Sequence, residues 1–383
     1  MPKAGSSIVT IKKRGPVDRV VLYITLALVV LGLIMMFSAS SARAMYMFGD
    51  SYFYIKDQAL FALIGFVMMI IISFIDYHIL KPFAWIIFIG SEILLAITLV
   101  MPEINNAHRW IFLGGHTFQP SELSKFAVIC LFALLISSHP ELMNKFRYGF
   151  LLFVILLGAI VVILYKQPHM SCAILILIIG FTMMLVGGTK FKWFLLVGAP
   201  ISLIGYIVIK ATDKLSYIGE RLMIWLDPFT GWPADGHQIR QSLIAIGSGG
   251  LTGLGLGNSR QKHMYLPESQ DDFIFSIIVE EIGFIGALFI MVLFLVLLIR
   301  GVRVATHCRD SFGSMLAVGI IVQITAQTLL NIAVVSNSFP NTGISLPFFS
   351  QGGTSLVMLM CEIGVLLSVS RYTDYEKNDE VSE

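Results

Sequence analysis

Long apolar runs, each of a length that can cross a lipid bilayer, recur along almost the whole of this 383-residue chain. A helix needs roughly 20 apolar residues to cross the hydrocarbon core of a membrane. Ten segments fit this requirement, at 18–38, 57–76, 83–101, 122–138, 147–166, 170–188, 191–211, 273–299, 311–335 and 355–370. Charged residues make up 13% of the chain, against about 25% in soluble domains. The sequence therefore predicts an all-α, polytopic integral membrane protein with about ten transmembrane helices.

The Lys and Arg residues between these segments predict how the chain is oriented. Fifteen of them fall in the N-terminal segment, alternate connections and the tail: Lys3, Lys12, Lys13, Arg14, Arg19, Lys81, Lys145, Arg147, Lys190, Lys192, Arg300, Arg303, Arg309, Arg371 and Lys377. Because cytoplasmic loops carry an excess of Lys and Arg, both termini are predicted to be cytoplasmic. The chain then comprises a cytoplasmic segment 1–17, a transmembrane domain 18–371 and a cytoplasmic tail 372–383. A large extracytoplasmic loop, 212–272, separates the seventh and eighth helices.

Polar residues of one outer connection suggest an anion site. The connection HRWIFLGGHTFQPSELSK contains Ser121 and Glu122 directly after a proline, which is typical of a helix start, and we favour that structural role for both. Lys125 is harder to explain structurally, because a cation on the outer face opposes the orientation rule, and Arg109 lies in the same connection. A planar guanidinium together with a point charge suits a phosphate or pyrophosphate at the membrane interface.

Acidic residues border the eighth apolar segment and also lie inside it. Asp271 or Asp272 can cap the start of that helix, and a capping carboxylate can also face a cavity. Glu280 lies eight residues beyond Asp272, roughly 12 Å deeper along an ideal helix. A charge at such depth normally faces the bundle interior or a polar cavity. Partial burial raises the pKa of a carboxyl group, which is one way to obtain a general base near neutral pH. Glu362 is another intramembrane acid, for which hydrogen bonding within the bundle is the favoured role.

Three further stretches of the outer face limit the possible functions. GSGGLTGLGLG lacks the GK[ST] ending of a phosphate-binding loop and follows no predicted strand, so a closely packed loop is favoured over a nucleotide site. LMIWL and SLIAI in the long loop predict short amphipathic helices that lie on the membrane or re-enter it. The uncharged segment NSFPNTGISLPFFSQGGTSL (337–356) predicts non-helical backbone that forms a wall or lid over the polar site. The four cysteines form no CxxC pair, so neither a zinc site nor a disulfide framework is predicted.

Three sequence blocks carry a family resemblance that extends over about residues 18 to 371. They are R-W-I-x-L-G-x(4)-Q-P-S-E-L-x-K, YLPE-x(3)-DFIFS-x(3)-EE-x-G and ISLPF-x-S-x-GGTSL. In this order, and with ten spans, they resemble the SEDS family of membrane glycosyltransferases, which includes FtsW, RodA and SpoVE. The stretches QK-x(2)-YLPE and PNTGISLPFFS are more similar to the division and sporulation branch (FtsW, SpoVE) than to the elongation branch (RodA).

The resemblance implies an activity and a set of site residues. The activity is polymerisation of lipid II, the undecaprenyl-pyrophosphate-linked disaccharide-pentapeptide, into glycan strands on the outer face of the bacterial cytoplasmic membrane. The family's essential aspartate falls on Asp272, and its arginine and lysine fall on Arg109 and Lys125. The expected site comprises Asp272 as general base, Asp271 and Glu280 as auxiliary candidates, and, for substrate binding, Arg109, Lys125, Gln119, Glu268, Lys262, Ser350, Gly352 and Gly353.

The resemblance also implies partners. These are a class B penicillin-binding protein, which is a transpeptidase with one membrane span, other division proteins and membrane lipid. No nucleic-acid partner is expected. No resident cofactor or metal is expected either, apart from a Mg²⁺ or Mn²⁺ ion that assists at the pyrophosphate.

The chain departs from the family pattern in several places. QPHMS stands where the family often shows QPDxGT, so that His169 replaces an acid. Gln270 and Asp271 stand where an HT pair is frequent, which leaves open whether Asp271 shares the work of its neighbour. None of these departures touches Asp272, Arg109 or Lys125.

Two other functions fit parts of the sequence. Intramembrane acids and Pro/Gly breaks also suit a transporter or flippase for lipid II, although the charges here cluster at the outer end instead of along a path. A scaffold that only recruits or activates the transpeptidase would leave Asp272 dispensable. Within the family, an elongation-type RodA-like polymerase is the alternative.

Overall fold

The computed structural model describes residues 15–102, 108–113, 116–198, 225–229 and 234–373. Its regular helices are α1 Arg19–Phe48, α2 Phe53–Phe74, α3 Leu80–Ile97, α4 Pro120–Ser138, α5 Leu152–Lys166, α6 Met170–Val186, α9 Ala234–Gly249, α10 Ile274–His307, α11 Ser311–Val335 and α12 Gly353–Ser370. Short helical turns cover Tyr77–Ile79, Thr98–Val100, Pro140–Leu142 and Phe146–Leu151. Within the described ranges, the only strands are β1 Ile111–Leu113 and β2 His116–Phe118, an antiparallel pair with Ile111 opposite Phe118.

The helices have the length and composition of membrane spans. Eight segments of the described chain are long and apolar enough to cross a membrane, at Arg19–Phe48, Phe53–Phe74, Tyr77–Val100, Pro120–Ser138, Phe146–Lys166, Ile274–His307, Ser311–Val335 and Gly353–Ser370. α6 is apolar but has only 17 residues. The chain is a polytopic, all-α membrane protein, as the sequence predicts. The count of ten stays a prediction, because much of the expected segment 191–211 and the start of the large loop lie outside the described residues.

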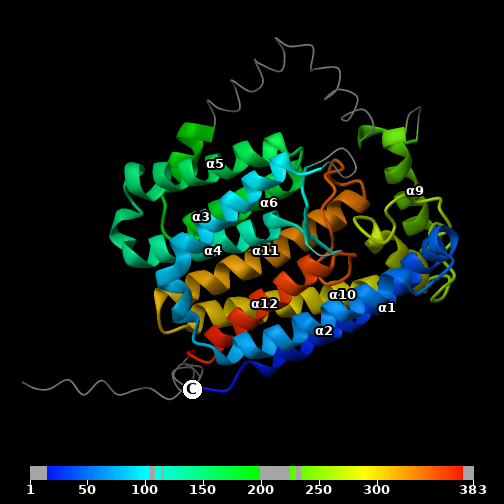
Figure 1. Ribbon diagram of the computed structural model, residues 1–383, viewed down its shortest axis with the longest axis horizontal. Coiled ribbons are helices and arrows are strands. Elements are labelled where there is room, and N and C mark those ends of the chain that lie inside the picture. Colours follow the sequence, from blue (N-terminus) through cyan, green and yellow to red (C-terminus); the bar gives the residue numbers. More distant parts are fainter. Residues whose placement is uncertain (1–14, 103–107, 114–115, 199–224, 230–233, 374–383) are drawn as a thin grey trace, which may run out of the picture.

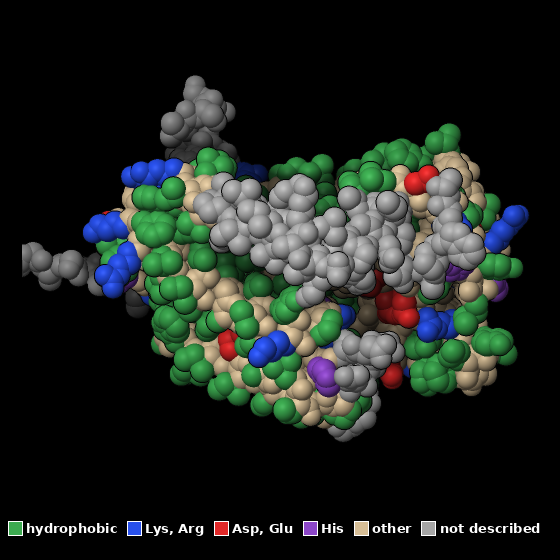
Figure 2. Space-filling model, turned by 90° about the horizontal axis from the view of Figure 1, so that it is seen from above, with side chains coloured by type: hydrophobic (Ala, Val, Ile, Leu, Met, Phe, Trp, Pro, Cys, Tyr) green, Lys and Arg blue, Asp and Glu red, His purple; other side chains and the backbone are tan. Residues whose placement is uncertain are grey.

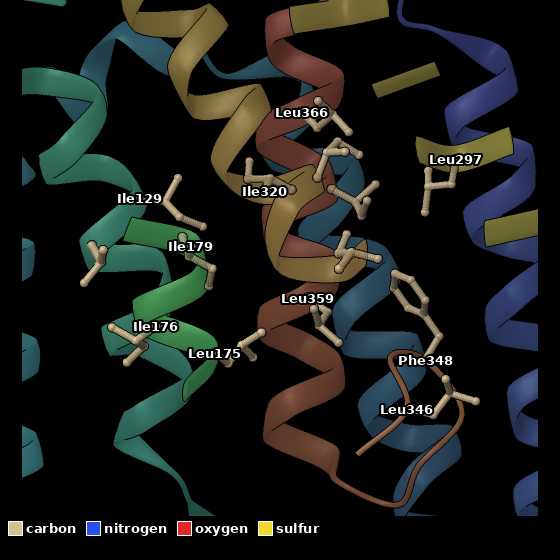
Figure 3. Packing of buried hydrophobic residues seen from close by; sticks show 14 of the residues in the cluster. Ile129, Leu175, Ile176, Ile179, Leu297, Ile320, Leu346, Phe348, Leu359 and Leu366 are labelled. Atoms are coloured by element: carbon tan, nitrogen blue, oxygen red, sulfur yellow. The ribbon is translucent and has the colours of Figure 1, made fainter. Parts of the chain in front are cut away.

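α11 is the central helix of the bundle (Figure 1). It packs against α10 and α12 on one side and against α4 and α6 on the other. α1 and α2 cover α10 and α12, while α3 and α5 cover α4 and α6. Figure 3 shows the resulting core, in which Ile129 and Ile179 lie on one side of Ile320, and Leu359 and Leu366 lie on the other. This packing leaves the outer faces of α1, α2 and α3 apolar and exposed to lipid.

Local sequence signals set several helix ends. Asp18 caps α1, because its side chain accepts hydrogen bonds from the amides of Val20 and Val21, and Gly49 ends that helix in a left-handed conformation. Pro120 occupies the first turn of α4, where its missing N–H is not needed. Asp310 caps α11 through the amide of Gly313.

The expected capping of the eighth span by Asp271 or Asp272 is wrong. α10 begins after Phe273, and no side-chain cap forms there within the described chain. Among the described residues, the amides of the first turn have no side-chain acceptor at the cap, and the amide of Ser276 donates to the carbonyl of Phe273 at 3.1 Å. The amides of Asp271 and Phe273 both donate to the carbonyl of Glu268, so the chain turns here before the helix starts. Both aspartate side chains are therefore free to face a cavity.

The glycine-rich loop has a packing role. α10 is interrupted at Gly283, whose φ of 71° is left-handed. Residues 250–255 lie along this interruption: the amide of Gly255 donates to the carbonyl of Glu281, and the amide of Phe284 donates to the carbonyl of Gly250. A Cβ at Gly253 would overlap the carbonyl oxygen of Glu281. The closely packed loop predicted from the sequence is confirmed.

The two described ends of the chain meet at one end of the bundle. The amide of Gly15 donates to the carbonyl of Arg371 at 2.8 Å, and the amide of Asp18 donates to the hydroxyl of Ser370 at 3.0 Å. Ser370 is the last residue of α12, and Gly353 is the first. An 18-residue helix is about 27 Å long. Whatever lies beside Gly353 is therefore on the opposite side of the bundle from the termini.

Candidate functional site

A cavity of about 640 Å³ opens at the end of the bundle where α12 begins. Its wall comes from α2, α4, α6 and α11, from the segment before β1 and from β2, and from the loops that precede α10 and α12. Figure 2 shows acidic and basic side chains gathered beside a hollow at this end of the molecule. Arg109, Lys125 and Asp272 all line the cavity. The arrangement expected from the sequence, a carboxylate near the eighth span that shares a pocket with two cations, is confirmed.

Asp272 is held by its backbone while its carboxylate faces the cavity. The side-chain amide of Asn331, on α11, donates to the backbone carbonyl of Asp272 at 2.7 Å and to that of Ile344 at 2.6 Å. Asn331 is completely buried, so this one residue ties two walls of the site together. Gly343 lies against the carboxylate, because a Cβ there would come within 3.0 Å of Asp272 Oδ2. Sequence reasoning missed Asn331, although a polar side-chain amide inside an apolar span signals a buried hydrogen-bonding role.

Burial and charge adjust the acidity of Asp272. Burial raises the pKa of this carboxyl group to about 6, the negative charge of Glu268 adds to the increase, and the Arg109 guanidinium opposes it. At neutral pH, Asp272 is thus mostly ionised and still basic enough to accept a proton. This is the range in which a general base is most effective.

Two more acids lie beside Asp272. Burial raises the pKa of Asp271 well above its usual value, and the hydrogen bond that its protonated carboxyl group donates to Glu268 and the negative charge of Asp272 act in the same direction. Glu268 also lines the cavity, and its carboxylate lies 3.9 Å from a guanidinium nitrogen of Arg43. Asp271 therefore shares the site with Asp272, as the sequence left open.

Arg109 is fixed against the turn that leads into α6. Its guanidinium donates a hydrogen bond to the carbonyl of Pro168. Burial lowers the pKa of Arg109, and the negative charge of Asp272 offsets part of that decrease. A guanidinium nevertheless stays protonated in proteins. Arg109 therefore brings a permanent positive charge to the cavity.

Lys125 is more deeply buried than the sequence suggests. Its side chain is only 2% exposed, and its ammonium lies 2.8 Å from the Glu122 carboxylate and 3.4 Å from the side-chain oxygen of Gln327. Glu122 also accepts a hydrogen bond from the hydroxyl of Ser355 at 3.1 Å. Glu122 thus does more than start a helix, because it holds the cation that faces the cavity.

The loop before α12 forms a wall of the site, as predicted. Gly352 and Gly353, at the junction of this loop with α12, line the cavity directly. Gln119, just before α4, also lines it. Ser350 lies behind this surface: its hydroxyl donates to the carbonyl of Asp271 at 2.7 Å and accepts from the amide of Leu346 at 2.7 Å. Ser350 therefore holds the wall in place, whereas a substrate-binding role was expected for it.

Lys262 and Glu280 are absent from the described residues that line the cavity. The Lys262 ammonium forms an ion pair with Glu281 at 2.9 Å, and Glu281 also accepts from the hydroxyl of Ser38 on α1. The Glu280 carboxylate accepts from the hydroxyl of Ser259 and from the amide of Arg260. Buried charges need such partners, and these are supplied by the loop that packs on α10. The placement does not support the substrate-binding role expected for Lys262 or the auxiliary role expected for Glu280.

Glu362 has the structural role expected for it. Its carboxylate, on α12, accepts a hydrogen bond from the side-chain amide of Gln323 on α11 at 2.8 Å. This contact joins two core helices well below the cavity.

Comparison with known proteins assigns the chain to a family. A family model described as "Cell cycle protein", for FtsW, RodA and SpoVE, matches residues 18–375. Stage V sporulation protein E of Bacillus subtilis (strain 168) is 41% identical over 372 residues, which cover 96% of this chain and 100% of that protein. The probable peptidoglycan glycosyltransferase FtsW of Geobacter sp. (strain M18) is 40% identical over 357 residues, which cover 92% of this chain and 96% of that protein.

Solved structures share the fold. A chain from a structure described as "Structural coordination of polymerization and crosslinking by a peptidoglycan synthase complex" is 26% identical, with a TM-score of 0.79 and coverage of 94% of this chain and 99% of that one. The rod shape determining protein RodA of Thermus thermophilus is 25% identical, with a TM-score of 0.68 and coverage of 94% and 98%. The chain belongs to the FtsW/RodA/SpoVE family of cell cycle proteins.

Proposed function

We propose that this protein is a peptidoglycan glycosyltransferase that polymerises lipid II into glycan strands during division or sporulation. The observation that carries the proposal is the meeting of Asp272, Arg109 and Lys125 in one cavity. The activity itself has support from relatives of about 40% identity that are named probable peptidoglycan glycosyltransferase FtsW. Similar identity to a sporulation protein and to FtsW supports the division or sporulation branch over the elongation branch.

Asp272 is the general base of the proposed reaction. Its carboxylate accepts the proton from the 4-hydroxyl of the GlcNAc unit of an acceptor lipid II. The hydroxyl oxygen attacks the anomeric carbon of the MurNAc at the reducing end of the growing strand, forming the new glycosidic C–O bond. The bond from that carbon to the diphosphate breaks, and undecaprenyl diphosphate leaves with the electron pair. General-base assistance is typically worth 10²–10⁴-fold in rate.

Arg109 and Lys125 stabilise the leaving group. The diphosphate gains a further negative charge as its bond to the sugar breaks, so cations fixed in the cavity bind the transition state more strongly than the ground state. The Arg109 guanidinium is held by the carbonyl of Pro168, and the Lys125 ammonium is held by Glu122. Because both are in place before substrate arrives, little reorganisation is needed during the reaction.

The position of the cavity suits an amphiphilic substrate. It lies at the end of spanning helices α2, α4 and α12, so a polyprenyl tail can remain in lipid while the sugars reach the carboxylates. The cavity and the termini lie at opposite ends of α12. Since the Lys and Arg excess lies on the side of the termini, the active site is proposed to face outward from the bacterial cytoplasmic membrane.

A class B penicillin-binding protein is the proposed partner. The similar solved complex is described as a peptidoglycan synthase that coordinates polymerization and crosslinking, which supports a crosslinking partner for this chain as well. Other division proteins remain a prediction.

A divalent cation at the diphosphate also remains a prediction. Across the described residues, no group of three or more His, Cys, Asp or Glu side chains has the arrangement of a metal site. None of the steps above uses a metal ion. Addition of a chelator to the polymerisation reaction tests this point.

The test uses the purified protein, with and without its transpeptidase, supplied with lipid II. Wild type is expected to make glycan polymer, which can be separated by electrophoresis, whereas Asp272→Ala and Asp272→Asn are expected to make none. Full polymerisation by both variants would remove Asp272 from the role of base. Translocation of labelled lipid II in vesicles that contain only this protein, unaffected by loss of Asp272, would favour a transporter instead.

A further inference from the structure

His169 lies on the wall of the cavity but has no part in the reaction as described. It follows Pro168, the residue whose carbonyl accepts the hydrogen bond from Arg109, in the turn between α5 and α6. Its side chain is 8% exposed and lines the same cavity as Arg109 and Lys125. The imidazole therefore sits beside both cations that would hold the leaving group.

Two buried nitrogen atoms of this wall lack partners. Neither His169 Nδ1 nor Arg109 Nε has a hydrogen-bond partner in the part of the chain that the structure describes. Leaving a buried polar atom unpaired is costly, so most buried polar groups of native proteins have a partner. Both atoms belong to residues that line the same cavity, where a bound ligand would supply the acceptor oxygens that they lack.

The turn that carries His169 is firmly anchored. The side-chain amide of Gln167 donates to the carbonyl of Leu95 and to the hydroxyl of Thr98, each at 2.7 Å. The amide of His169 donates to the carbonyl of Leu164 at 3.0 Å. The imidazole is thus presented to the cavity by a fixed backbone, as a preorganised binding group requires.

Beside the two cations alone, the imidazole is neutral. Burial, together with the positive charges of Arg109 and Lys125, lowers the pKa of His169 to about 3. The acidic groups that line the cavity are Asp57 from α2, Glu122 from α4, and Glu268, Asp271 and Asp272 from the segment before α10.

We propose that His169 is a third donor of the diphosphate subsite, and that it takes up a proton when the diphosphate binds between Arg109 and Lys125. The negative charge of the diphosphate offsets the two cations that otherwise oppose protonation. Both ring nitrogens of the resulting imidazolium are donors, so the unpaired Nδ1 gains an acceptor. This inference rests on the proposed function, because it assigns the leaving group of that reaction to these residues.

The proposal gives a physical meaning to the histidine at position 169. An aspartate, frequent here in the family, would place a fixed negative charge beside the cations. A neutral histidine adds no charge of its own beside the cations before the anion binds, and it adds a positive charge only when the anion is present. The protein groups of the diphosphate subsite therefore carry one more positive charge when the diphosphate is bound than when the subsite is empty.

The experiment measures how many protons the protein takes up when the diphosphate binds. Undecaprenyl diphosphate is titrated by calorimetry into Asp272→Asn and into the double variant Asp272→Asn/His169→Gln, at about pH 7 and in two buffers of different ionisation enthalpy. The Asp272→Asn background removes turnover and removes the titration of the Asp272 carboxyl group, which would otherwise mask the effect. Glutamine keeps a hydrogen-bonding side chain that does not titrate.

On binding undecaprenyl diphosphate, Asp272→Asn is expected to take up as much as one proton more than the double variant. Its dissociation constant is expected to rise with pH more steeply, by up to about tenfold per pH unit. Equal proton uptake and equal pH dependence would overturn the inference. If His169→Gln fails to fold, as judged by size-exclusion chromatography, His169→Asn is used in its place.

A polymerisation assay separates this inference from the proposed function. If wild type polymerises lipid II while the two variants show equal proton uptake, the function stands and the role of His169 is wrong. If wild type makes no polymer, the function itself fails. If neither variant binds undecaprenyl diphosphate, the diphosphate subsite is wrong as a whole.

Discussion

Lys125 and Glu122 form an ion pair, 2.8 Å apart and one helical turn from each other, with almost no exposure to solvent. Removal of one partner of a buried pair leaves an uncompensated charge, at a cost of about 3–5 kcal/mol, whereas removal of both costs much less. We therefore expect Lys125→Met and Glu122→Gln each to lower the thermal unfolding midpoint in detergent, and the double variant to recover most of the loss.

The polymerisation activities of these variants should not follow their stabilities. The double variant is expected to stay inactive, because the cation for the diphosphate is missing. The pair Lys56–Asp50, at 2.6 Å but largely exposed, is the control. Its double-mutant coupling is expected to be below about 1 kcal/mol. Recovery of polymerisation together with stability would contradict a direct role for Lys125.

The pH dependence of polymerisation should report Asp272. A general base works only when deprotonated, so the rate is expected to rise about tenfold per pH unit below the pKa of about 6 and to level off above it. Glu268→Gln removes a negative neighbour that raises this pKa, and should move the midpoint of the profile to lower pH. An unchanged midpoint would argue against the assigned base, provided that folding is intact at each pH.

Arg109→Lys tests the planar guanidinium while keeping the charge. Loss of the fork that contacts the carbonyl of Pro168 is expected to reduce polymerisation at least tenfold, and Arg109→Ala by roughly 10²–10³-fold. Lys56→Ala is the matched control, since this lysine is exposed at the same end of the molecule and should have little effect. Arg43 is unsuitable as a control, because its guanidinium lies near Glu268 of the cavity. Equal activity of Arg109→Ala and Lys56→Ala would contradict the subsite.

Gly253 and Gly283 should tolerate no side chain. Both have left-handed φ values, 81° and 71°, and a Cβ at either would overlap backbone of the other segment. Gly253→Ala and Gly283→Ala are therefore expected to destabilise the protein by more than about 2 kcal/mol, measured by thermal unfolding. Gly90→Ala in α3 is the control, because nothing lies within 4 Å of its added Cβ. Wild-type stability of both variants would mean that the loop does not pack on α10 as described.

Hydrophobic length explains why the membrane spans could be predicted from the sequence. A lipid core allows only helices or closed barrels, so an apolar run such as that of α11 has few alternatives. The pairing of Asp272 with Arg109 in one cavity also followed, because topology places their connections on the same face. The spans and the placement of both connections on one face needed only composition and the distribution of charges, whereas the choice of Asp272 as the base came from the family resemblance.

Contacts between distant segments were not accessible in the same way. Whether Glu122 starts a helix or holds Lys125 depends on how α4 packs against α11 and α12, and sequence spacing allows both. Lys262 was expected from the family resemblance to bind substrate, yet its ammonium is paired with Glu281, 19 residues further on. Asn331 acts through two carbonyls that belong to separate loops. Such roles are set by tertiary packing.

The hydrogen bond between the Gly15 amide and the Arg371 carbonyl holds the two described ends of the chain together, and this offers a way to monitor folding. Because the first and last helices emerge side by side, the two halves of a split fluorescent protein, one fused to each end, should reassemble on a single molecule. Fluorescence would then signal that the bundle has closed, and it could be followed in living cells without any knowledge of the substrate.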